Sequence, residues 1–88
     1  MATFIRATDS EAVELDQEWI ILHPDQFTVT KINEVGGVCW GLLKEPQTVS
    51  SLAGHIATRY EIDSREAEGD IEAFLLHMQE IGMIRHAG

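Results

Sequence analysis

The sequence predicts an α+β fold of winged-helix-like shape, in which a three-stranded antiparallel sheet is followed by three helices. Three observations lead to this prediction. Short apolar runs separated by turn residues fill the first third of the chain, which is typical of strands. Apolar residues at helical spacing fill the remainder. A residue type that commonly caps helices precedes each helical stretch.

Three segments are predicted strands: Ala12–Leu15, Trp19–His23 and Phe27–Ile32. Between the last two, Pro24-Asp25 is a turn signal, because proline fixes φ and aspartate can bond its own backbone. The second and third strands should therefore form an antiparallel hairpin. The first strand should pair with the other side of the second. This order leaves Phe27–Ile32 at an edge of the sheet.

Two helices are predicted next. Asn33 caps the first, which should end before Pro46 because a proline disfavours helix at the residue before it. Thr48 caps the second. One face of that second helix carries an apolar stripe formed by Val49, Leu52, Ala53, Ile56, Ala57 and Tyr60.

The third predicted helix runs from about Ser64 to Ile81. Asp63 and Glu66 form a D-x-x-E pattern that resembles a capping box at its start. The acidic residues of its first turns either stabilise the helix dipole or form a patch that attracts a lysine-containing peptide. Gly82 should end the helix, and Met83-Ile84 either adds a short strand or packs on the core.

Length and charge narrow the class of protein. The chain has 88 residues, with 15 acidic side chains against six Lys or Arg and a formal charge of −9, so we expect one domain over residues 1–88 with a core at about 12–84. The six cations are scattered, whereas a free-standing nucleic-acid binder needs a cationic face. The lack of clustered cations also argues against binding to an anionic membrane surface. The acidic excess either aids solubility or favours cationic or neutral partners.

The compartment can also be predicted. Cys39 is the single cysteine, so no internal disulfide can form, which fits a reducing compartment. Residues 1–6 do not resemble a signal peptide, and no apolar run approaches the ~20 residues that span a bilayer. We expect a cytoplasmic protein.

The sequence gives no pattern typical of catalysis or of metal binding. The four histidines share no metal-ligand spacing with one another or with Cys39, so we expect neither a metal site nor a cofactor. Cys39 lies on the apolar stripe of the first helix, which favours a buried structural thiol. Gly36-Gly37 lacks the residues that follow in a phosphate loop, and indicates close packing of helix on sheet. We therefore expect a protein that is not an enzyme.

The predicted edge strand is the feature that points to a function. An edge presents unpaired N–H and C=O groups, and proteins either protect such groups or use them to add a strand from another chain. Lys31 and the threonines of Phe27–Ile32 fit edge protection. Addition of an extended peptide is the alternative, with side-chain pockets supplied by a helix beside the strand.

The order and spacing of several motifs resemble those of the PqqD-like proteins. The pattern I-N-E-V-G with Trp40 four residues after Gly36 matches the L-N-x-x-G-x-x-x-W of family members, although Cys39 replaces the more usual aliphatic residue. The resemblance covers about Leu15 to Ile84. The motifs that carry it are LDQEWIILHPD (Leu15–Asp25), KINEVGGVCWGLL (Lys31–Leu43), Thr48-Val49, LAGHIATRY (Leu52–Tyr60), DIEAFL (Asp70–Leu75) and IGMI (Ile81–Ile84).

Proteins of this family are RiPP recognition elements, which bind the leader segment of a ribosomally made precursor peptide and deliver it to modifying enzymes. The resemblance implies that a leader adds to the third strand, in the cleft between that strand and the third helix. Phe27, Val29 and Phe74 would line pockets for the leader's ring and apolar groups. The implied peptide-binding residues are Phe27, Thr28, Val29, Thr30, Lys31 and Ile32 on the strand, and Asp70, Ala73, Phe74 and His77 on the helix.

The resemblance is greatest to the stand-alone leader-binding proteins of lasso-peptide biosynthesis, which implies a leader peptidase and a macrolactam-forming cyclase as partners. A peptide chaperone of pyrroloquinoline-quinone type, working with a radical-SAM enzyme, is the alternative in the same class. Two other classes are a winged-helix DNA-binding regulator, which the charge disfavours, and a small enzyme completed by a partner. We expect a monomer or a dimer through the edge strand Phe27–Ile32.

Overall fold

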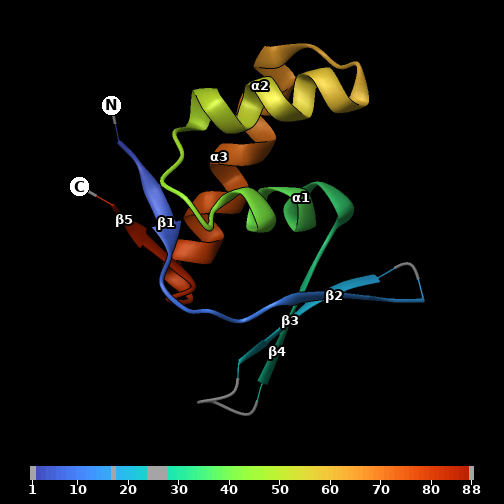
Figure 1. The fold of residues 1–88 in the computed structure, drawn as a ribbon. Helices are drawn as coiled ribbons and strands as arrows, with labels where there is room; N and C mark the ends of the chain where they lie inside the picture. Colours follow the sequence, from blue (N-terminus) through green and yellow to red (C-terminus); the bar gives the residue numbers. More distant parts are fainter. Residues whose placement is uncertain (1, 17, 24–27, 88) are drawn as a thin grey trace.

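A computed structural model describes residues 2–16, 18–23 and 28–87 of the chain. The predicted α+β class, with a three-stranded sheet before three helices, is confirmed (Figure 1). Two further strands lie near the ends of the chain. The elements in order are β1 (Phe4–Arg6), β2 (Ala12–Leu15), β3 (Glu18–His23), β4 (Thr28–Ile32), α1 (Glu34–Leu42), α2 (Val49–Tyr60), α3 (Ser64–Glu80) and β5 (Ile84–His86).

The three-stranded sheet has the predicted order β2-β3-β4, and both pairings are antiparallel. Ile21 at its centre lies opposite Ala12 on one side and Thr30 on the other. In the described part of the chain β4 pairs with β3 alone, so it is the predicted edge. The predicted turn Pro24-Asp25 and Phe27 lie outside the described residues. The helices lie on one side of this sheet (Figure 1).

The second sheet joins the two ends of the chain. β1 pairs with β5 in antiparallel register, from Phe4 opposite His86 to Arg6 opposite Ile84. Phe4 also exchanges two backbone hydrogen bonds with Gln47, with N–O distances of 2.8 and 2.9 Å. The sequence predicts no strand before Ala12, so β1 is a correction to that reading. Both alternatives for Met83-Ile84 hold, because Ile84 begins the strand β5 and both side chains are buried in the core.

Side-chain caps begin α1 and α2 where the sequence predicts them. The backbone N–H of Gly36 donates to Asn33 Oδ1 at 2.7 Å. At α2 the backbone N–H of Ser51 donates to Thr48 Oγ1, and the backbone N–H of Thr48 donates to Ser51 Oγ, both at 2.9 Å. This is a complete capping box in which a serine takes the place of the usual glutamate or glutamine.

The ends of α3 also lie close to their predicted places. Asp63 caps the helix by accepting a hydrogen bond from the backbone N–H of Arg65 at 2.7 Å, two residues on rather than at Glu66. The helix runs to Glu80, and Gly82 adopts a φ of 79° just beyond it. Glycine tolerates this left-handed conformation, which turns the chain out of the helix toward β5.

Trp40 on α1 lies at the centre of the core, and the N-terminal segment covers it. The Arg6 guanidinium lies 4.5 Å from the centroid of the indole ring, and Arg6 Nε donates to the Trp40 carbonyl at 2.8 Å. The indole N–H donates to the Ser10 carbonyl at 2.8 Å. Fully buried side chains around it are Ile21, Cys39, Leu43, Leu52, Ile56, Ile71, Met78 and Met83.

None of the helices in the described ranges is long and apolar enough to cross a bilayer.

Candidate functional site

A groove runs between the edge strand β4, the start of α1 and the middle of α3. Its volume is about 450 Å³. We call it the edge groove, and its lining residues are Lys31, Ile32, Asn33, Val35, Gly36, Cys39, Asp70, Ile71, Ala73, Phe74 and His77. Six of the ten predicted peptide-binding residues are among them, so the fold brings the predicted strand and the predicted face of α3 together.

The floor of the edge groove is apolar and has little space to spare. A Cβ at Gly36 would lie 3.0 Å from Phe74 Cε1 and 3.2 Å from Ile32 Cβ, so the glycine lets the half-buried Phe74 ring lie against α1. Cys39 is fully buried, and this burial raises the pKa of its thiol to about 11. The thiol is therefore neutral at physiological pH and is a poor nucleophile, as its place on the apolar stripe indicates.

The rim of the edge groove is polar. Asp70 and His77 are exposed on α3, and their spacing of seven residues places them on the same face of the helix. Lys31 on β4 also lines the groove, although it lies opposite Ile20, and its side chain forms an ion pair with Glu18 at 3.7 Å. That pair is mostly exposed, so its contribution to stability is small. An apolar floor between polar rims suits a peptide that buries alternate side chains and keeps its backbone bonded.

Strand alternation assigns the side chains of β4 to two faces of the sheet. Thr30 lies opposite the buried Ile21 on the face toward α1, where His23 Nε2 and Thr30 Oγ1 are hydrogen-bonded at 2.7 Å. Val29 lies opposite Leu22 on the other face and is 55% exposed. The prediction that Val29 lines a pocket together with Phe74 is therefore wrong, although the backbone of Val29 stays in the edge strand.

Five residues that line the edge groove are absent from the sequence prediction: Ile71 on α3, and Asn33, Val35, Gly36 and Cys39. The last four come from the cap and first turns of α1. The signal for them was present, because a helix that starts directly after an edge strand must begin beside that strand. From sequence, Asn33 is predicted to be a helix cap and the two glycines are predicted to allow close packing. Neither role places these residues at the groove.

The face of the three-stranded sheet that points away from α1 carries five apolar side chains beside the Lys31–Glu18 ion pair, because Lys31 lies opposite Ile20 and Glu18 opposite Leu15. We call it the outer sheet face and define it by Val13, Leu15, Ile20, Leu22 and Val29. Four of these side chains are exposed: Val13 37%, Leu15 56%, Leu22 47% and Val29 55%. Ile20 lies opposite Val13 and is half-buried. The signal was the continuous run Trp19–Leu22, because a strand that is apolar at every position has two faces to cover.

No group of three or more potential metal ligands gathers within the described ranges.

The sequence profile of coenzyme PQQ synthesis protein D (PqqD) matches residues 18–84. The chain belongs to the PqqD family. The resemblance found in the sequence motifs is thereby confirmed. The residues matched to the PqqD profile include β3, the edge strand β4 and all three helices, and therefore every residue that lines the edge groove. β1 and β2 precede the matched region.

Two solved structures share the fold of this PqqD-family chain. One is TbiB1 in complex with the TbiA(beta) leader peptide, which is 22% identical, with a TM-score of 0.74 and coverage of 92% of this chain and 94% of that chain. The other is lasso peptide synthetase B1 complexed with the leader peptide, which is 20% identical, with a TM-score of 0.74 and coverage of 93% and 96%. No curated protein matches the chain.

Proposed function

We propose that this PqqD-family chain binds the leader segment of a ribosomally synthesised precursor peptide by adding it as a strand to the free edge of β4. One observation carries this proposal: the edge strand directly borders a groove with an apolar floor. A peptide paired with β4 would form a backbone ladder and direct alternate side chains into the edge groove. The two solved proteins of the same fold are both described as leader-peptide complexes, which supports this role.

In this proposal the chain acts as a single domain that delivers a peptide and catalyses nothing itself. The backbone ladder comes from Phe27–Ile32, and the pocket wall from Asp70, Ala73, Phe74 and His77. The location is the cytoplasm, in keeping with a free thiol at Cys39.

Lasso-peptide biosynthesis is the pathway that we propose, with a leader peptidase and a macrolactam-forming cyclase as partners. A similar solved protein that is described as a lasso peptide synthetase component supports this choice. The matching family profile is named for coenzyme PQQ synthesis, which favours a peptide chaperone working with a radical-SAM enzyme as the second candidate. The identity of the precursor whose leader binds distinguishes the two.

We propose that the leader peptidase docks on the outer sheet face. A leader paired with β4 extends the sheet by one strand, so its outward side chains continue the apolar surface that Leu22 and Val29 begin. A peptidase that cuts this leader must contact it. Docking on the continuous surface would bury exposed apolar area and place the enzyme against its substrate.

The test is a fluorescence-anisotropy titration with labelled leader peptide from the neighbouring precursor gene, on the wild type and on Val29→Pro and Thr30→Pro. Adjacent residues of a strand direct their N–H groups to opposite sides, so one of the two prolines removes an N–H from the free edge and the other a bond to β3. We expect the edge variant to stay folded and to lose about tenfold or more in leader affinity.

Random-sequence duplex DNA is the control ligand. The formal charge of −9 predicts that it does not bind at physiological salt. Unchanged leader affinity in both proline variants, each with a wild-type circular dichroism spectrum, would refute strand addition at this edge. DNA binding in place of leader binding would support a winged-helix regulator.

A further inference from the structure

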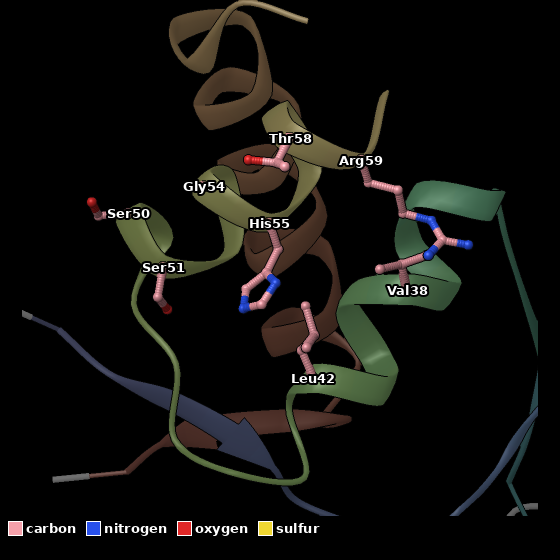
Figure 2. Close-up of a pocket in the computed structure, with 8 residues that line it drawn as sticks. All are labelled: Val38, Leu42, Ser50, Ser51, Gly54, His55, Thr58 and Arg59. Atoms are coloured by element: carbon pink, nitrogen blue, oxygen red, sulfur yellow. The ribbon is translucent and has the colours of Figure 1, made fainter. Parts of the chain in front are cut away.

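A second groove lies between α1 and α2 (Figure 2). Its volume is about 700 Å³. We call it the helix groove, and its lining residues are Val38, Leu42, Ser50, Ser51, Gly54, His55, Thr58 and Arg59. The two grooves have no lining residue in common, because α1 contributes Val35, Gly36 and Cys39 to the edge groove and Val38 and Leu42 to the helix groove.

The helix groove has one apolar wall and one polar wall. Val38 and Leu42 are four residues apart, so they share a face of α1. Ser51, His55 and Arg59 repeat at the same spacing along α2. In Figure 2 the His55 ring points from α2 toward Leu42, and the Arg59 side chain extends toward Val38. Both walls thus carry side chains spaced by one helical turn.

The charge of the helix groove is opposite to that of the molecule. Among the residues that the structure describes, no acidic side chain lines it, whereas Arg59 does. The Arg59 guanidinium lies 5.8 Å from the centroid of the Tyr60 ring, and the described residues place no carboxylate within ion-pair distance of it. His55 is exposed, and its ring has no hydrogen-bond partner among those residues. The groove therefore offers unused donors to an acceptor from outside.

We propose that the helix groove docks an amphipathic, acidic helix of the macrolactam-forming cyclase. The partner helix packs apolar side chains against Val38 and Leu42 and presents a carboxylate to Arg59, since a guanidinium and a carboxylate can pair through two parallel hydrogen bonds. Two walls with a four-residue repeat match the side-chain ridges of a third helix. The apolar wall disfavours a bare anion, and the net charge of −9 disfavours nucleic acid.

The choice of the cyclase rests on the proposed function. The edge groove is assigned to the leader and the outer sheet face to the peptidase, and neither shares a residue with the lining of the helix groove. The helix groove is thus the surface left for the second enzyme. A partner held by Arg59 also explains a cation in a groove of an otherwise acidic protein, because opposite charges across an interface steer association and suppress wrong partners.

The test compares two groove variants with a matched control. Arg59→Glu reverses the charge. Gly54→Phe adds a ring at a lining position where nothing lies within 4 Å of a Cβ, and circular dichroism checks that this variant keeps the wild-type fold. Arg65→Glu makes the same charge change at an exposed position that does not line the groove. The binding of purified cyclase and of labelled leader is measured for each chain by calorimetry and by anisotropy.

We expect Arg59→Glu and Gly54→Phe to weaken cyclase binding by about tenfold or more, and Arg65→Glu to change it by less than about twofold. Leader affinity should stay at the wild-type value in all three. Cyclase binding that both groove variants retain, or that the wild type lacks, overturns the inference. Cyclase binding is also measured in the absence of leader. A failure of leader binding would therefore contradict the proposed function, while the cyclase measurement would still test the helix groove.

Discussion

At the scale of single residues, two adjacent glycines determine how closely α1 approaches its neighbours. A Cβ at Gly37 would lie 2.7 Å from the Trp19 ring on β3, which is closer than a side-chain carbon can approach. Gly36 makes the same kind of room for Phe74 on α3. α1 therefore lies against both β3 and α3 at this point, and the edge groove is formed where α1 and α3 meet the edge strand β4.

We predict that Gly37→Ala destabilises the protein by about 1–3 kcal/mol, because the added methyl group must displace the Trp19 ring. Gly41→Ala on the same helix is the matched control. Nothing lies within 4 Å of its Cβ, so alanine should stabilise α1 there by about 0.5–1 kcal/mol. Urea unfolding measures both. Equal midpoints for the two variants would show that contact with Trp19 does not limit the approach of α1.

Residue identity predicted the helix caps, whereas the family resemblance implied six of the eleven residues that line the edge groove. Asn33, Thr48 and Asp63 are recognisable from sequence because a cap depends on a side chain and a few residues after it. The face of β4 that meets α1 cannot be predicted in this way. Strand alternation shows that Val29 and Thr30 lie on opposite faces, but not which of the two faces the core. That choice depends on how the sheet packs against the helices, and a local sequence pattern does not determine it.

At the scale of elements, β3 explains why the sheet has two uses. Ile21 faces the core and is fully buried, whereas its neighbours Ile20 and Leu22 belong to the outer sheet face. A strand with one buried face needs apolar residues only at every second position. The additional apolar residues of β3 form the surface on which we propose that the peptidase docks.

We predict that Leu22→Glu leaves folding and leader binding nearly unchanged and weakens binding of the leader peptidase by about tenfold or more. The reason is that Leu22 is 47% exposed in the free protein but would be buried in the complex. Leu76→Glu is the matched control, because Leu76 is 60% exposed on α3 outside the outer sheet face. The affinity of the purified peptidase for each variant checks this, and equal loss in both would contradict the assigned surface.

The elements differ in how well sequence predicts them. β2, β3 and β4 are joined by short connections, and α1 to α3 carry full helical stripes, so local patterns indicated them. β1 and β5 have three residues each and pair across the whole length of the chain. Three residues are too few to show a period of two, and the partner strand lies beyond the reach of any sequence window.

At the scale of the whole molecule, the two-stranded sheet closes the fold. β1 is the strand partner of β5, bridges to Gln47 before α2, and ends with Arg6 over the buried Trp40. One short segment thus holds the C-terminal strand, the α1–α2 connection and the centre of the core. Burial lowers the pKa of Arg6, although Glu11 and Asp9 act in the opposite direction.

We predict that deletion of residues 2–7 lowers the free energy of unfolding by about 2 kcal/mol or more. The deletion removes the Arg6 stacking and several backbone hydrogen bonds, each of which contributes on the order of 1 kcal/mol. The urea midpoint measures the loss, and deletion of Ala2 alone is the control. A midpoint unchanged by the longer deletion would show that β1 lies on the fold without stabilising it.

The pairing of β1 with β5 also brings the two ends of the chain together. The backbone N–H of Ala87 donates to the Thr3 carbonyl at 2.9 Å, and both ends lie beside the helices, apart from β4 (Figure 1). A host enzyme could therefore carry this chain inside one of its surface loops, with a small gap to bridge at the points of insertion. The host enzyme would then contain a leader-binding domain, and under the proposed function it would bind any precursor peptide that carries a suitable leader.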